Sequence, residues 1–360
     1  MATTPIYTLD FDEIGLKDVA RVGGKNASLG QLFNALKPMG VGALDGFAIT
    51  ADAYHRLLIE RNLEFQLRSL LSDFDPEDVE ELAARGHAAR AAVLETPLPD
   101  DLRSAILAAY YRLCARLGRE PELAVRSSAT AEDLPEASFA GQQEPFLNVR
   151  GREALLRATH ACFASLFTDR AISYRARHGF DHLQVALSVG VQPMVRSDRA
   201  SAGVIFTLDT ESGFRDVVVV TGSYGLGEFV VQGVITPDEW TVFKPALAKE
   251  HYSELAGHPQ PMDLEWAKDG LTGELFILQA RPETVHSAKP RMAVAEIYRL
   301  KGEAAAPLVT GQAVGEKIGA GRVRVVRDAE TLTTVEAGDV LVTEMTDPDW
   351  EPVMKRVAAL

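Results

Sequence analysis

The chain has 360 residues, of which 46% are hydrophobic, and a formal net charge of −14. This length allows two or three domains with a substantial core, and the acidic balance argues against a nucleic-acid partner. No run is apolar enough to span a membrane, and the first residues lack a leader pattern, so we expect a cytoplasmic protein with no membrane partner. Cys114 and Cys162 lie in helix-like apolar patterns, which predicts free thiols rather than a disulfide framework.

The first part of the chain predicts a short strand at residues 6–9, a turn and a second strand before residue 22. The sequence Gly23-Gly24-Lys25 then opens a predicted helix, because the residues from 26 to 32 have helical apolar spacing. Two glycine amides and an ammonium at a helix N-terminus favour phosphate, although an ordinary turn with a surface lysine has the same pattern.

A loop and strand are predicted at residues 42–50, followed by helices from 51 to about 117. We expect these helices to be scaffold. Residues 152–178 predict further helix, residues 185–195, 202–208 and 216–220 predict strands, and the glycines of 223–228 predict a turn.

Residues 124–149 combine features that suit a phosphate ligand. Arg126 stands near the end of a predicted strand, and a guanidinium grips phosphate oxygens with a planar fork. The segment 137–143, ASFAGQQ, has small residues whose backbone N–H groups, including those of Gly141 and Gln142, suit an anion nest. The alternative is a solvated hairpin with one surface arginine.

Two alternating segments near residue 270 predict an antiparallel hairpin with polar groups on one face. Asp263 and Glu265 share a face of the first strand, Gln279 and Arg281 share a face of the second, and residues 268–273 supply the turn. Carboxylate and amide oxygens are ligands that Mg²⁺ accepts, and arginine stabilises a phosphoryl group in transfer. The alternative is a hairpin whose polar face is merely hydrated.

Segments spread over the whole chain resemble the nucleotide-binding domain of the phosphoenolpyruvate synthases, the water-dependent members of the pyruvate phosphate dikinase superfamily. Several blocks in one consistent order are more specific than any single glycine motif. Besides ASFAGQQ, the segments are GGKNASLG (23–30), ASLFTDRAISYR (164–175), ALSVGVQPMV (186–195), FTLDTESGF (206–214), SYGLGE (223–228), PMDLEWAKDG (261–270), ILQARPETV (277–285) and GDVLVTEMTDPDWEPVMKR (338–356).

The resemblance implies an α+β fold and three domains. Residues 1–195 would form the N-terminal lobe of a two-lobed ATP-grasp, and residues 196–290 its second lobe, shortened near 246–260. Residues 291–360 would begin a swivelling β/β/α phosphohistidine domain that lacks its histidine motif.

The resemblance also implies ATP and Mg²⁺ as ligands and phosphoryl transfer from ATP to a histidine and then to pyruvate. Glutamine suits adenine recognition because its amide has both a donor and an acceptor. By position, the roles fall to Lys25, Arg126, Gly141 and Gln142 for the phosphates, Gln192 for the base, Glu265, Gln279 and Asp263 for Mg²⁺, and Arg281 with Arg126 for the transfer itself.

Three departures from the family pattern limit what the resemblance implies. Pro145 stands where the family usually has threonine, so a hydroxyl and an N–H are missing. Residues 246–260 replace several tens of residues, and the sequence stops before the family's phosphohistidine motif and pyruvate-binding barrel. We therefore expect that this chain alone does not complete the reaction, and that a separate chain carrying those domains is its partner.

Two other interpretations stay open. The chain is a non-catalytic nucleotide-binding or interaction module left from a truncated dikinase, such as a relative of rifampin phosphotransferase, or it is a decayed remnant that folds poorly. Whether it is an enzyme is left open by the sequence.

Overall fold

The structure is a computed structural model, and it describes residues 5–76, 78–130, 133–134, 137–138, 145–210, 212–231, 233–246, 261–283, 318–326, 334–343 and 350–360. The chain divides into two compact units. The first comprises Met1–Leu208 with Arg215–Glu283, and the second Asp209–Phe214 with Thr284–Leu360. Helices and strands are mixed in the first unit, so the expected α+β class is confirmed at this level.

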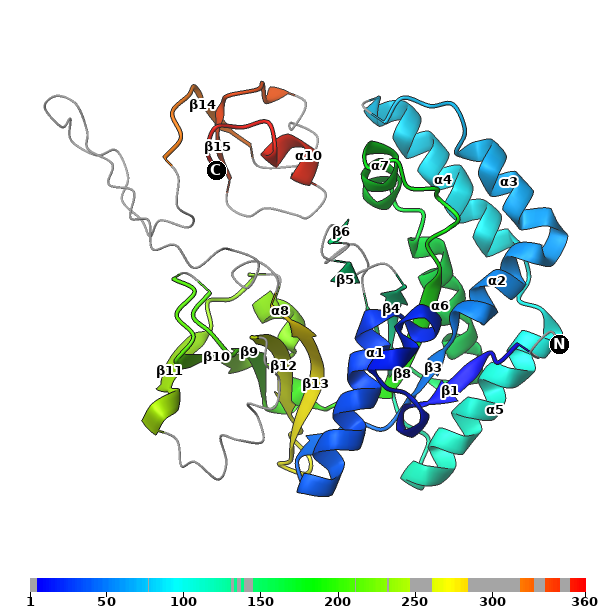
Figure 1. The fold of residues 1–360 in the computed structure, drawn as a ribbon, viewed down its shortest axis with the longest axis vertical. Coiled ribbons are helices and arrows are strands. Elements are labelled where there is room, and N and C mark those ends of the chain that lie inside the picture. The colour runs from blue at the N-terminus through cyan, green and yellow to red at the C-terminus, as the bar shows by residue number, and fades with distance from the viewer. Residues whose placement is uncertain are drawn as a thin grey trace, which may run out of the picture. The chain divides into compact units, whose positions relative to one another are not determined.

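A five-stranded antiparallel sheet forms one half of the first unit (Figure 1). Its order is β1-β3-β8-β4-β7, so strands far apart in the sequence are neighbours. The strands are β1 (Thr8–Asp10), β3 (Phe47–Ile49), β8 (Leu187–Pro193), β4 (Leu123–Ala129) and β7 (Phe146–Val149).

Helices cover both faces of this sheet. In β3, Phe47 and Ile49 pack into the larger hydrophobic cluster with α2, α5 and α6, whereas Ala48 between them packs into a smaller cluster with α1. The helices of this unit are α1 (Val19–Leu36), α2 (Ala51–Ile59), α3 (Leu63–Leu70), α4 (Val79–Glu95), α5 (Asp100–Leu117), α6 (Gly151–Ser165), α7 (Asp169–Arg177) and α8 (Gly227–Val231).

A six-stranded sheet forms the other half of the first unit, in the order β11-β10-β9-β12-β13-β2. Only the β13 and β2 pair is parallel. The strands are β11 (Asp238–Phe243), β10 (Val217–Tyr224), β9 (Ser201–Phe206), β12 (Met262–Lys268), β13 (Leu275–Pro282) and β2 (Gly42–Ala43). Ala202 of β9 and Ala267 of β12 form a small buried cluster with Val195.

The predicted hairpin near residue 270 is confirmed, since β12 and β13 pair antiparallel with Asp263 opposite Arg281 and Glu265 opposite Gln279. The second strand predicted before residue 22 is wrong. Residues Phe11–Glu13 and Leu16–Asp18 form 3₁₀ turns instead, each closed by a carboxylate that accepts a backbone N–H.

The second unit is described in part. Strands β14 (Val323–Val325) and β15 (Val340–Val342) pair in parallel, and α10 (Glu351–Met354) follows. Its buried cluster contains Val326, Val335, Leu341 and Trp350. A further short pair, β5 (Asp133–Leu134) and β6 (Ala137–Ser138), belongs to the first unit and is antiparallel. None of the described helices is long and apolar enough to cross a membrane.

Candidate functional site

A pocket of about 430 Å³ lies between the two sheets of the first unit. Small-molecule sites are typically of this order, roughly 300–1,000 Å³. The first sheet contributes residues of β4, β7 and β8, the second contributes residues of β9, β12 and β13, and α1 and α8 complete the wall. Segments separated by more than two hundred residues in the sequence therefore meet at one place.

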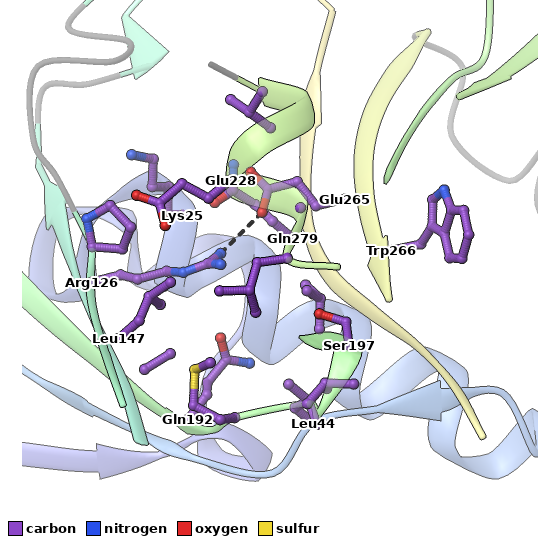
Figure 2. Close-up of a pocket in the computed structure, with 18 of the residues that line it drawn as sticks. Lys25, Leu44, Arg126, Leu147, Gln192, Ser197, Glu228, Glu265, Trp266 and Gln279 are labelled. Atoms are coloured by element: carbon purple, nitrogen blue, oxygen red, sulfur yellow. Dashed lines mark hydrogen bonds and ion pairs between the residues drawn. The ribbon is translucent and has the colours of Figure 1, made fainter. Parts of the chain in front are cut away.

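The two ends of the pocket differ in chemistry. Figure 2 shows Lys25, Glu228 and Gln279 gathered around the ion pair of Arg126 and Glu265. Gln192 lies toward the other end, which is lined mainly by apolar side chains and Ser197 (Figure 2). The apolar side chains of the lining include Leu44, Leu147, Met194, Val195 and Leu278.

Lys25 reaches the pocket because the backbone breaks at Gly23. Gly23 has φ +72° and ψ 166°, so the regular part of α1 begins only after it. A Cβ at Gly23 would come within 2.3 Å of Ser128 Oγ, which shows how closely this glycine approaches β4. The predicted helix start at the two glycines is confirmed.

Arg126 and Glu265 connect the two walls of the pocket. Arg126 Nη1 donates to Glu265 Oε2 at 3.1 Å, and the side chains are 24% and 26% exposed. Arg126 Nε is buried and has no hydrogen-bond partner among the described residues. A buried donor of this kind normally has an acceptor, so this atom is suited to an oxygen of a ligand.

Arg281 pairs across the hairpin with Asp263, whose side chain is 12% exposed. Nε and Nη2 of Arg281 each lie 2.7 Å from Asp263 Oδ2. Burial raises the pKa of the Asp263 carboxyl above its usual value, although the charge of Arg281 opposes this. Arg281 also lines the pocket, whereas Asp263 is not among the lining residues that the structure describes.

Most of the sequence-predicted site residues meet in this pocket. Asp263 lies beside it, held by Arg281, and its predicted role in binding metal stays a prediction. Gly141 and Gln142 lie outside the described residues. The predicted site residues that line the pocket are Lys25, Arg126, Gln192, Glu265, Gln279 and Arg281. Pro145, which departs from the family pattern, also lines it.

Some pocket residues were not predicted from the sequence. Glu228 follows Gly227 at the start of α8, inside the glycine turn 223–228, and places a second carboxylate on the pocket wall. The glycine turn at 223–228 is the sequence feature from which a role of Glu228 in the pocket could have been predicted. Leu44, Ser197 and Trp266 carry no such signal, because a single apolar or hydroxyl side chain is common at any position.

The pocket offers a set of oxygen ligands and cations that suits a metal–nucleotide complex. Glu265 and Gln279 are register partners on neighbouring strands, so their oxygens share one face, and hard oxygens are what Mg²⁺ takes. Gln279 is buried, which restricts its orientation. Lys25, Arg126 and Arg281 also line the pocket, and cationic side chains form strong hydrogen bonds with phosphate oxygens.

Comparison with protein families matches this chain to the model of the pyruvate phosphate dikinase AMP/ATP-binding domain over residues 19–254 and 246–302. Among curated proteins, phosphoenolpyruvate synthase of Synechocystis is 46% identical over 413 residues, covering 97% of this chain and 50% of the relative. The Escherichia coli phosphoenolpyruvate synthase is 46% identical over 404 residues, covering 97% of this chain and 50% of the relative. A probable phosphoenolpyruvate synthase of Methanocaldococcus jannaschii is 38% identical over 397 residues, covering 97% and 32%. The chain spans about half the length, or less, of these curated relatives.

Proposed function

This chain belongs to the family of the pyruvate phosphate dikinase AMP/ATP-binding domain, and from that premise we propose that it binds ATP with Mg²⁺ between its two sheets. The observation that carries the proposal is the convergence of six predicted ligand residues in one pocket. They come from α1, β4, β8, β12 and β13, and a solvated hairpin or a surface lysine would not require such convergence.

The two ends of the pocket give the nucleotide a direction. The phosphates lie at the charged end, where Lys25, Arg126 and Arg281 supply cations. The base lies at the apolar end, where the amide of Gln192 offers a donor and an acceptor to adenine. Gln192 is 4% exposed, so its polar group has little water to satisfy it.

Magnesium fits beside the phosphates, with Glu265 and Gln279 as the residues that would hold it. When bound there, Mg²⁺ would neutralise charge on the phosphates. A phosphate oxygen beside Arg126 would take the place of Glu265 as its partner and would give the buried Nε an acceptor. Arg281, kept in place by Asp263, supports the phosphoryl group in transfer.

The finer architecture follows from the same proposal. Apart from β2, which adds residues 42–43 to the second sheet, the two sheets correspond to the lobes of an ATP-grasp, with residues 1–195 and 196–290 as the lobes and 291–360 as the start of a phosphohistidine domain. The site serves phosphoenolpyruvate synthesis, in which ATP, pyruvate and water give phosphoenolpyruvate, AMP and phosphate by way of a phosphohistidine. That histidine and the pyruvate site belong to the domains that follow this part in the relatives or to a partner chain.

A second candidate function is a nucleotide-binding module without catalysis. The family match falls into two pieces that overlap at residues 246–254. The alignment with the Synechocystis relative runs over 413 residues although it covers 97% of a 360-residue chain, so the relative has residues that this chain lacks. A shortened second lobe favours a chain that binds the nucleotide but does not transfer its phosphoryl group efficiently.

Titration calorimetry of the folded chain with ATP and MgCl₂ tests the proposal. We expect saturable binding that Lys25→Ala weakens by about tenfold or more, since a charge-assisted contact is lost. Lys17→Ala is the matched control, because Lys17 is exposed in the preceding turn and outside the pocket lining. Absence of ATP binding by folded wild-type chain contradicts the proposal. Binding without transfer to a histidine-bearing partner favours the second candidate.

A further inference from the structure

Asn26, next to Lys25, is buried in a polar network that joins α1 to the first sheet. Its backbone N–H donates to Ser128 Oγ at 3.3 Å, and its side-chain Nδ2 donates to Ser188 Oγ at 3.0 Å. Ser188 Oγ in turn donates to the backbone oxygen of Ile49 at 2.6 Å. Asn26, Ser128 and Ser188 are at most 2% exposed, so water does not compete for these bonds.

Two glycines leave room for this network. A Cβ at Gly190 would lie 2.3 Å from Asn26 Oδ1, so any larger residue at this point of β8 would displace the amide of Asn26. On the other side of Lys25, Gly23 packs against Ser128 with positive φ. Lys25 is thus bracketed by two points of close contact with the sheet, while its side chain lines the pocket.

The same network reaches the strand that carries Arg126. Ser128 is two residues beyond Arg126 on β4, and Ser128 pairs with Ser188 in the register of β4 and β8. Arg126 pairs with Gly190 in that register. The backbones that present Lys25 and Arg126 are therefore tied through Asn26, and neither backbone can shift relative to the other without disturbing a buried hydrogen bond.

We propose that Asn26 is a positioning residue that sets the spacing between Lys25 and Arg126 for the β- and γ-phosphates of a nucleoside triphosphate. This inference rests on the proposed ATP site and adds a determinant of phosphate-chain recognition to it. Asn26 itself does not line the pocket among the described residues. Its effect is passed on through the backbone of Lys25 and through Ser128.

The test compares the dissociation constants of ATP and AMP, each with MgCl₂, for wild type and Asn26→Ala. Positioning predicts that the variant weakens ATP binding by about tenfold, and AMP binding by less than about twofold, because AMP lacks the phosphates concerned. A purely structural role would weaken both nucleotides by the same factor. Ser188→Ala removes the acceptor of the Asn26 amide, together with the bond from Ser188 Oγ to the backbone oxygen of Ile49, and serves as the second variant if Asn26→Ala does not fold.

Asn34→Ala is the matched control on the same helix. Asn34 Nδ2 donates to the backbone oxygens of Phe11, Asp12 and Ile14, and Asn34 is not part of the site. This control is expected to lower the melting temperature and to leave the ratio of ATP to AMP affinity unchanged. An unchanged ratio in Asn26→Ala and Ser188→Ala overturns the inference, whereas failure of the wild type to bind ATP overturns the proposed function itself.

Discussion

Arg126 of the first sheet and Glu265 of the second form an ion pair across the pocket, with Nη1 and Oε2 3.1 Å apart. Each side chain is about a quarter exposed, and such pairs contribute at most ~1 kcal/mol. Phosphate oxygens and a divalent cation offer each partner a stronger replacement. Under the proposed function, the pair marks the place where a metal–nucleotide complex would separate the two groups.

Glu265→Gln is expected to remove most of the Mg²⁺ dependence of ATP affinity. The amide keeps the shape of the side chain but not the charge that attracts the cation, and it releases Arg126 from its ion pair. Calorimetry with MgCl₂ and with EDTA measures the effect. We expect ATP affinity to fall about tenfold or more with Mg²⁺ and not to fall with EDTA.

Glu239→Gln is the control for this prediction, since Glu239 is an exposed glutamate on β11 of the same sheet and outside the pocket lining. It should behave as wild type. If Glu265→Gln keeps the wild-type response to Mg²⁺, the assignment of Glu265 to the metal is wrong.

Arg281→Ala is expected to weaken ATP binding and also to destabilise the fold. It leaves the Asp263 carboxylate, which is largely buried, without its arginine, at a cost of about 1–2 kcal/mol. Urea denaturation measures the loss. The double variant Asp263→Asn/Arg281→Ala should regain stability but not ATP affinity, and recovery of both would show that Arg281 has no direct role toward the ligand.

Pro145→Thr is expected to tighten ATP binding. Pro145 lines the pocket just before β7 and has neither a backbone N–H nor a hydroxyl. Threonine adds both donors, and one additional hydrogen bond corresponds to roughly a few-fold in affinity. Pro145→Ala restores the N–H alone and separates the two contributions. Unchanged affinity in both variants would place residue 145 away from the phosphates.

The structure predicts a histidine-dependent loss of stability in acid. Burial lowers the pKa of His182 to about 4, with a further contribution from the positive charge of Arg175, while the charge of Asp181 opposes the shift. Arg175 Nε donates to His182 Nδ1 at 3.3 Å. The ring of Phe74 also packs against His182. In the unfolded chain the pKa is about 6.5, so between those values the unfolded state binds more protons. The contribution of His182 to the free energy of unfolding is therefore complete above pH 6.5, and it is lost as the pH falls toward 4.

The measurement is the melting temperature as a function of pH. His182→Gln should lose less stability than wild type between pH 6.5 and 4, because it cannot take up that proton. His55→Gln, which removes an exposed histidine of α2, should follow the wild type. Parallel curves for wild type and His182→Gln would show that His182 is not held neutral by its surroundings.

Local features were predictable from the sequence because their causes are local. The β12–β13 hairpin follows from alternation and a glycine turn, and the start of the regular part of α1 follows from Gly23. The 3₁₀ turns at 11–18 were missed, because Phe11 and Ile14 both pack toward α1 and the carboxylates of Glu13 and Asp18 close the turns. An apolar pattern in so short a segment does not distinguish these turns from a strand.

Long-range pairings were not predictable from local pattern. The resemblance to known enzymes supplied the individual site residues, but not the ion pair of Arg126 with Glu265, whose members are far apart in the sequence. The contacts of Asn26 with Ser128 and Ser188 are equally remote. Which polar side chains meet depends on the order of strands in the sheets, and this order does not follow from the spacing of residues.

The most direct test of the central claim is amide hydrogen exchange of the chain with and without ATP and MgCl₂, resolved by peptide. Binding between the sheets predicts slower exchange on both walls, in β4 and β8 of the first sheet and in β12 and β13 of the second. Lys25→Ala should reduce this protection at a nucleotide concentration just sufficient to saturate the wild type. Unchanged exchange in all four strands at saturating ATP, or protection confined to other segments, would contradict an ATP site in this pocket.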